Sequence, residues 1–277
     1  MGPPERTRRL IVNADDFGRS RSINAAVIQA HREGILTTAS LMVNGDACEE
    51  AVELARQNPN LGVGLHLALV CGRAALPKTE IPGLVDSHGD FGDDPVRAGM
   101  RYFFERGLRP QLAREIDAQF ARFQATGLTL DHVNGHLNLH LHPVVWRILA
   151  DVGARRGMTR VRVTRDRFWL NARIACGNWG YRTSHAIIFS LLSARVRPEL
   201  RARGWRHTNW VFGLLQNARV DTEYVRCLLP LLPAGDSELY SHPSVDEYKP
   251  ELDALLDPGV KALVREQGIR LIRYQDL

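Results

Sequence analysis

The chain has 277 residues, 44% of them hydrophobic, which is enough for a sizeable core in one large or two small domains and excludes a disordered protein. No apolar run approaches the ~18 residues of a membrane span. The net charge is +5, but the arginines are scattered and no recognition motif accompanies them, so we predict no nucleic-acid partner.

The start of the chain does not have the pattern of a signal peptide. Residues 1–10 are basic, and about four apolar residues follow before the polar "NADD", too few for a signal-peptide core. The four cysteines have no CxxC spacing, which is typical of reduced thiols rather than of a disulfide framework or a zinc knuckle. We therefore expect a cytoplasmic protein, with at most a peripheral contact to the inner membrane.

Short apolar runs alternate with segments of helical period along most of the chain. The strand-like runs lie at 9–14, 37–45, 61–69, 130–143, 159–164, 209–215 and 237–244. The helical segments lie at 22–34, 47–59, 110–127, 143–157, 222–235 and 258–268. Repeated strand-then-helix units predict a parallel sheet, either a barrel or a doubly wound sheet, in a single domain over residues 1–277.

Glycines and loops divide these units. Gly34, Gly127, Gly157 and Gly268 follow helical segments, where we expect left-handed backbone that ends each helix. Residues 71–95 are too rich in Pro, Gly and Asp for a helix or strand. A loop of this length in a compact domain tends to be functional.

Carboxylates and histidines recur near the ends of the apolar runs. Asp15 and Asp16 end the first, His66 lies within the third, and His132, His136 and His242 belong to later ones. In parallel sheets these side chains collect at the carboxyl edge. One Asp with two His suits a divalent metal that keeps a position open for water, and the second Asp would act beside that water as a base.

Each of these residues has a purely structural alternative. The Asp pair could cap the next helix, His66 could be a satisfied core histidine, and His242 before Pro243 could end a strand. The tract "DHVNGHLNLHLH" has four histidines in eleven residues, which alternate with apolar residues and would point largely to one face of a strand. It is the clearest single indication of metal binding.

Together, "NADDFG", "GLHLAL", "DHVNGHLNLHLHP" and "LYSHP" resemble the YdjC-like carbohydrate deacetylases, which include chitooligosaccharide deacetylases. Four further stretches resemble the hopanoid-biosynthesis branch, HpnK: "HREGILTTASLMVN", "EIPGLVDSHGDF", "MRYFFERG" and "HTNWVFGL". The resemblance implies a distorted (β/α) barrel of mostly parallel strands, similar to polysaccharide deacetylases.

The resemblance also assigns roles. It implies that Asp16, His66 and His136 bind one divalent metal ion, with Zn, Mg, Mn and Co all compatible, that Asp15 is the catalytic base and that His242 protonates the leaving amine. It also implies candidate substrate contacts at His132, Asn134 and His140, and a homodimer. Relatives often carry Asp where this chain has Asn134, which affects substrate contacts rather than ligands.

The implied substrate of that branch is an N-acetylglucosaminyl hopanoid lipid, and the alternatives are a chitooligosaccharide or other N-acetylated sugar deacetylase and a related metal-dependent phosphoesterase. A binding protein on the same scaffold is a further rival. Residues 183–206 are apolar in their first half and Arg-rich in their second half, and Trp179 and Trp205 lie near the two ends of this segment. This composition suits either an interfacial helix at a membrane or a core helix with a solvated basic end.

Overall fold

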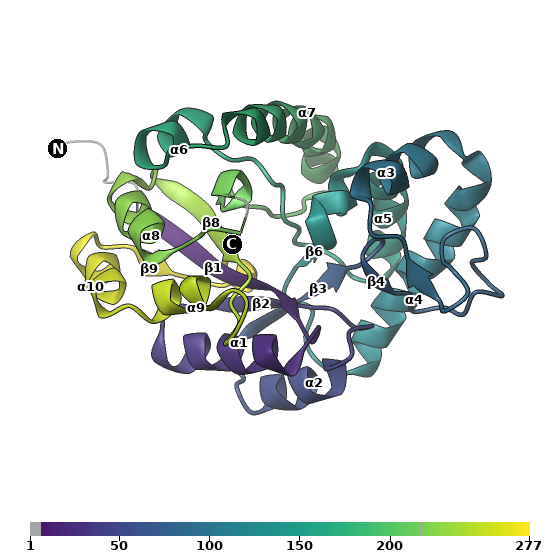
Figure 1. The fold of residues 1–277 in the computed structure, drawn as a ribbon, viewed down its shortest axis with the longest axis horizontal. Helices are drawn as coiled ribbons and strands as arrows, with labels where there is room; N and C mark the ends of the chain where they lie inside the picture. Colours follow the sequence, from purple (N-terminus) through teal and green to yellow (C-terminus); the bar gives the residue numbers. More distant parts are fainter. Residues whose placement is uncertain (1–6, 217) are drawn as a thin grey trace.

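The computed structural model describes residues 7–216 and 218–277, so part of the basic N-terminal segment lies outside the described residues. A central sheet of parallel strands runs in the order β6-β3-β2-β1-β8-β7, and β9 pairs with the start of β1 (Figure 1). The strands are β1 (Arg8–Phe17), β2 (Thr38–Leu41), β3 (Gly62–Leu67), β6 (Val133–Gly135), β7 (Trp210–Phe212), β8 (Gly235–Ser241) and β9 (Arg270–Leu271).

The sheet curls toward closure through the predicted strand at 159–164. Val161 bridges to Val133 of β6, and the Val211 amide of β7 donates to the carbonyl of Arg165 at 3.0 Å. Residues 160–165 therefore lie between the two ends of the sheet. The arrangement confirms the predicted distorted (β/α) barrel of mostly parallel strands, because every pairing in this sheet is parallel.

Helices surround the strands (Figure 1). They are α1 (Arg21–Glu33), α2 (Cys48–Arg56), α3 (Pro95–Phe104), α4 (Arg109–Ala125), α5 (Pro143–Arg155), α6 (Phe168–Ile174), α7 (Trp179–Arg203), α8 (Thr222–Leu228), α9 (Lys249–Leu256) and α10 (Pro258–Glu266). The 3₁₀ turns are η1 (Arg106–Leu108), η2 (His136–Leu141), η3 (Leu214–Gln216), η4 (Leu229–Leu231) and η5 (Tyr274–Asp276).

Three of the four predicted glycine stops are left-handed, with φ of +74°, +80° and +59° at Gly127, Gly157 and Gly268. The prediction was wrong at Gly34, where φ is −111°. A Cβ at Gly34 would run into the carbonyl oxygen of Leu255, so close packing against α9 is what requires glycine here.

The segment after β3 is more ordered than its composition predicted. It contains a short antiparallel pair, β4 (Gly72–Arg73) and β5 (Asp90–Phe91), and then α3, which the sequence analysis did not identify. Glu115 of α4 is fully buried and accepts hydrogen bonds from the amides of Ala75 and Leu76 at 2.7 and 3.0 Å. This long-range anchor, which is invisible in local composition, holds the loop in place.

None of the helices in the described part of the chain has the length and apolar character that a membrane crossing requires. All four cysteines are free thiols, and Cys176 and Cys227 are exposed.

Candidate metal centre

Both carboxylates of the Asp15-Asp16 pair reach the same histidine because β1 is irregular there. The pairing with β2 runs from Ala14↔Ala39 to Phe17↔Leu41, so β1 holds one extra residue. Asp16 has a left-handed φ of +64°, as the turn of such a bulge requires. His66 Nδ1 lies 3.9 Å from Asp15 Oδ1, and His66 Nε2 lies 3.2 Å from Asp16 Oδ1.

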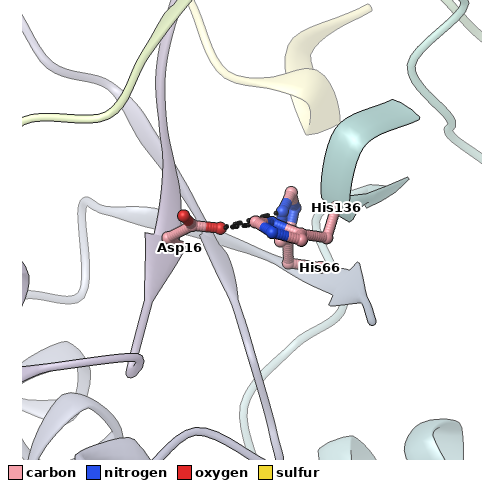
Figure 2. A group of neighbouring side chains, drawn as sticks. All are labelled: Asp16, His66 and His136. Atoms are coloured by element: carbon pink, nitrogen blue, oxygen red, sulfur yellow. Dashed lines mark hydrogen bonds and ion pairs between the residues drawn. The ribbon is translucent and has the colours of Figure 1, made fainter. Parts of the chain in front are cut away.

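Asp16, His66 and His136 form a buried cluster (Figure 2). One possible ligand atom from each lies within 4.8 Å of the other two, and His136 Nδ1 is 2.9 Å from Asp16 Oδ1. The three residues come from the ends of β1 and β3 and from η2, directly after β6. A carboxylate oxygen with two imidazole nitrogens is a donor set that borderline divalent cations accept.

The surroundings of His66 fix which of its nitrogens faces the cluster. The Asn134 amide nitrogen donates to Ser40 Oγ at 2.8 Å, so its oxygen faces His66 Nδ1 at 2.7 Å and accepts from it. His66 Nε2 is then the lone-pair nitrogen, and it is buried without a hydrogen-bond partner. Two electron-rich atoms, Nε2 and Asp16 Oδ1, face each other at 3.2 Å, so this site fits a cation between them.

The charges in the cluster are strongly coupled. Burial opposes ionisation of Asp16, yet the neighbouring His136 holds the pKa of this carboxyl well below its usual range. Burial also opposes protonation of His136, but the Asp16 carboxylate raises the pKa of that imidazole to about 9. A proton or a metal ion is therefore required in this cluster at neutral pH.

Asp15 is held by an arginine that sequence reasoning did not identify as part of the site. Arg162 is fully buried and donates from Nη1 to Asp15 Oδ2 at 2.7 Å and from Nη2 to Asp15 Oδ1 at 2.9 Å. Although burial opposes it, the Arg162 charge holds the pKa of Asp15 far below its usual range. Asp15 is therefore ionised and fixed in orientation, while Asn13 and Asn134 donate to its Oδ1 as well.

The Arg162 guanidinium also forms an ion pair with a second carboxylate, that of Glu238. Arg162 Nη2 also donates to Glu238 Oε1 at 2.7 Å, and the hydroxyl of Tyr274 donates to Glu238 Oε2. Two signals in the sequence could have identified this group. Arg162 stands between two valines in "TRVRVT", and Glu238 stands next to apolar residues in "SELY". A charged side chain in such a run needs a partner when it is buried.

His242 lies at the end of β8, beside a buried glutamate. Its backbone amide donates to Glu251 Oε2 at 2.5 Å, and its ring Nδ1 is 3.8 Å from the same oxygen. Burial opposes protonation, but Glu251, helped by the charges of Asp16 and Asp15, raises the pKa of His242. The imidazole is about a quarter exposed, at 28%, so a protonated ring is accessible at the rim of the cluster.

The His-rich tract does not present its histidines on one strand face, and that prediction was wrong. Only Val133–Gly135 is a strand, and Leu137 and Asn138 have left-handed φ of +51° and +55°, which turn the chain into η2. The alternation of the tract therefore ends at His136, and its histidines enter separate environments.

The predicted substrate contacts at His132 and His140 are buried in the structure. His132 uses both ring nitrogens, Nδ1 with Asp131 at 3.0 Å and Nε2 with Ser40 at 2.9 Å, and stacks on Tyr274. His140 Nε2 bonds the Arg162 carbonyl at 3.0 Å, and burial lowers the pKa of this imidazole to about 3. Both histidines, like Asn134, are buried and form hydrogen bonds with other residues of the protein.

A cavity of about 870 Å³ adjoins the cluster. Arg19, which is half exposed and pairs with Asp16 Oδ2 at 3.0 Å, lines its inner end. Its other walls include Cys71 and Phe91, and several Asp and Arg side chains of the 71–95 loop and α3. A cavity of this size, lined by both charged and apolar side chains, has room for a sugar-sized group beside the cluster.

Comparisons with known proteins show which proteins this chain is similar to. A family model described as YdjC-like protein matches residues 9–266. The carbohydrate deacetylase of Geobacillus stearothermophilus is 31% identical over 97% of this chain and 98% of its own. The chitooligosaccharide deacetylase of Enterobacter sp. (strain 638) is 30% identical over 97% and 98% of the two chains.

Two further matches add detail. A carbohydrate deacetylase of Brevibacillus brevis is 43% identical over 141 residues, which cover 51% of this chain and about half, 54%, of that relative. A crystal structure from Enterococcus faecalis V583 superposes with a TM-score of 0.73 at 23% identity, covering 98% of both chains. This superposition confirms the fold.

Proposed function

The chain belongs to the YdjC-like protein family, and from this membership and the geometry of the site we propose that it is a metal-dependent N-deacetylase of N-acetylated amino sugars. The observation that carries the proposal is the buried group of Asp16, His66 and His136, with Asp15 and His242 beside it. A single YdjC-like domain over residues 1–277, a homodimer and a cytoplasmic location are part of the proposal.

Asp16, His66 and His136 would hold one divalent cation, whose identity among Zn, Mg, Mn and Co the donor set leaves open. A bound divalent cation lowers the pKa of a coordinated water towards ~7 and polarises the acetyl carbonyl. Asn134 orients His66, as described above, and Arg19 holds the outer oxygen of Asp16. Both contacts support a fixed ligand arrangement.

Asp15 and His242 would move the protons. Asp15 is ionised and held by Arg162, so it can accept the proton of the attacking water as the new C–O bond forms. His242, protonated through Glu251, can give its proton to the amine nitrogen as the C–N bond breaks. The products would be acetate and a free amine on the sugar.

For the substrate we propose an N-acetylglucosaminyl hopanoid lipid. The support for it is sequence resemblance to the HpnK branch, in "HREGILTTASLMVN", "EIPGLVDSHGDF", "MRYFFERG" and "HTNWVFGL". The second of these stretches, residues 80–91, contributes residues to the wall of the 870 Å³ cavity, and the third continues α3. The segments that carry the resemblance therefore lie in part where a substrate would be selected.

A chitooligosaccharide is the second candidate substrate, because the Enterobacter relative carries that name and aligns over nearly the whole chain. The phosphoesterase alternative has less support. Two-metal phosphoesterases place their metals ~3.5–4 Å apart and use additional carboxylates. Within residues 7–216 and 218–277, one group of three metal-binding side chains is found.

Acetate release tests the proposal. Metal-analysed protein is incubated with an N-acetylglucosaminyl hopanoid and, separately, with N-acetylated chitooligosaccharides, and acetate is followed by mass spectrometry. We expect acetate from the lipid. Acetate from the oligomers alone would keep the reaction and exclude the hopanoid substrate, and no acetate from either by metal-loaded protein would refute the deacetylase.

A further inference from the structure

Five large apolar side chains of α6 and α7 are exposed to solvent. We call Trp169, Trp179, Ile187, Ile188 and Leu191 the α6–α7 apolar face, and their exposed fractions are 80%, 49%, 56%, 49% and 68%. Ile187 and Leu191, together with Phe168, also line a surface hollow of about 390 Å³. Single exposed apolar residues are common in soluble proteins, but several on two neighbouring helices, some of which line one hollow, are typical of an interaction site.

The segment that carries this face is strongly basic. Residues 165–206 contain nine arginines and two acids, Asp166 and Glu199. Asp166 is buried, and Glu199 is occupied by hydrogen bonds from Trp146 and Arg203. The exposed charge around the α6–α7 apolar face is therefore almost entirely positive, and Arg173 and Arg195 are among its exposed residues.

The face lies beside the candidate metal centre. Phe168 and Ala186 pack against a small core cluster that includes Tyr240, and Tyr240 receives a weak hydrogen bond of 3.4 Å from Asn138 of η2. Ser193 of α7 donates to the carbonyl of Thr164 at 2.9 Å. Helix α7 thus contacts η2, the turn that carries His136, and α6 and α7 run together along one edge of the molecule (Figure 1).

A second helix in contact with η2 also exposes apolar side chains. Helix α3 contacts η2 and exposes Val96, Met100, Phe103 and Phe104, while Leu137 of η2 itself is 49% exposed. Two helices that contact the turn with His136, α3 and α7, therefore both expose apolar groups. This arrangement differs from scattered surface hydrophobics, because these groups gather around the one described metal-binding cluster.

We propose that the α6–α7 apolar face docks on a lipid bilayer with anionic head groups. Tryptophan and aliphatic side chains partition into the interface of a bilayer, and arginines beside them pair with lipid phosphates. A second copy of the chain is a poorer occupant, since the two faces would bring their arginines together. Docking would place the mouth of the metal centre close to the membrane surface.

Vesicle flotation tests this proposal without any substrate, so its result is independent of the proposed reaction. The wild-type chain is floated with vesicles of phosphatidylcholine mixed with phosphatidylglycerol and with phosphatidylcholine alone. We expect binding to the mixed vesicles that weakens as salt rises, because exposed charges are screened. The variant Trp169→Ser/Ile187→Ser/Leu191→Ser should bind at least ~10-fold less, since three apolar groups no longer enter the interface.

A charge-reversal pair provides the matched comparison. Arg173→Glu/Arg195→Glu should lower binding to the mixed vesicles about 10-fold, whereas Arg265→Glu/Arg270→Glu, exposed on α10 and β9, should lower it much less. Unchanged thermal unfolding of all variants checks their folds. The proposal is overturned if the wild type does not float with either vesicle, if the triple variant floats equally well, or if that variant converts a wild-type dimer to a monomer.

Discussion

Arg162 and Asp15 form a two-pronged ion pair, with both carboxylate oxygens within 2.9 Å of a guanidinium nitrogen, and neither side chain is appreciably exposed. The two residues are 147 positions apart in sequence, and this contact brings them together in the site. Removing either partner would leave an uncompensated buried charge, which costs far more than an exposed one.

Replacing the guanidinium should therefore destabilise the fold. We expect Arg162→Met to lower the free energy of unfolding by ~3–5 kcal/mol, because Asp15 and Glu238 lose their buried counter-charge. Urea unfolding measures this. The double variant Arg162→Met/Glu238→Gln should recover part of the loss, and a double variant no more stable than the single one would contradict this account.

Replacing the proposed base, Asp15, should lower activity without changing the metal content. Asp15→Asn should reduce kcat about 10²–10⁴-fold, because an amide cannot take the proton of water, while the metal content stays at the wild-type level. Steady-state kinetics with elemental analysis of the same preparation checks both. The control is Asp236→Asn, which should leave kcat unchanged. Asp236 is a part-exposed acid that pairs with Arg9 and lies at the start of β8, away from the end of that strand that leads to His242.

Replacing a proposed metal ligand should instead weaken metal binding. Asp16→Ala and His136→Ala should each weaken metal affinity on the order of 100-fold or more, because a three-donor site loses one donor. His142→Ala, from the same tract but outside the cluster, is the matched control and should retain metal. Unchanged metal content in Asp16→Ala by elemental analysis would exclude the assignment of this ligand.

Activity should decline on the alkaline side as His242 loses its proton. Glu251 raises the pKa of His242, so the protonated acid persists above the usual titration range of histidine. Glu251→Gln removes this stabilisation of the cation and should move the alkaline limb of kcat/KM to lower pH. Glu247→Gln, exposed on the neighbouring loop, should leave the limb in place, and an unmoved limb in Glu251→Gln would reject the acid role.

Asp166 should make stability depend on pH. Burial raises the pKa of this carboxyl to about 7, from about 3.8 in an unfolded chain. The folded state therefore binds the extra proton between these values, so the contribution is full below pH ~3.8 and is lost as pH rises through 7. Urea unfolding between pH 5 and 8 should show a shallower decline in Asp166→Asn than in the wild type, and parallel declines would contradict this assignment.

The sequence was sufficient for the part of the site that lies at strand ends. Asp16 and His66 come directly from β1 and β3, so the rule that functional groups gather at the carboxyl edge of a parallel sheet placed them together. The fold class followed from the same alternation of strand and helix. In both cases local periodicity carries the information.

The remaining parts of the site and fold depend on contacts between residues far apart in sequence, which local periodicity does not reveal. The left-handed residues Leu137 and Asn138 end the alternation of the His tract after His136. The hydrogen bonds of His132 with Ser40 and of His140 with the Arg162 carbonyl join residues far apart in sequence. Arg162 acquires its role from Asp15 and Glu238, which lie far away in sequence. Helix α3 was missed because most of its large apolar side chains, such as Met100 and Phe104, face solvent, while only Tyr102 is buried.

The buried charges beneath the site are supplied by four distant stretches of the chain, and this affects the order of events during synthesis. Asp15 emerges from the ribosome first, Arg162 follows 147 residues later, Glu238 76 residues after that, and Tyr274 a further 36. Domains fold broadly from the N-terminus while the chain grows. The buried group of Asp15, Arg162, Glu238 and Tyr274 can therefore be completed only after Tyr274 has been made, almost at the end of synthesis.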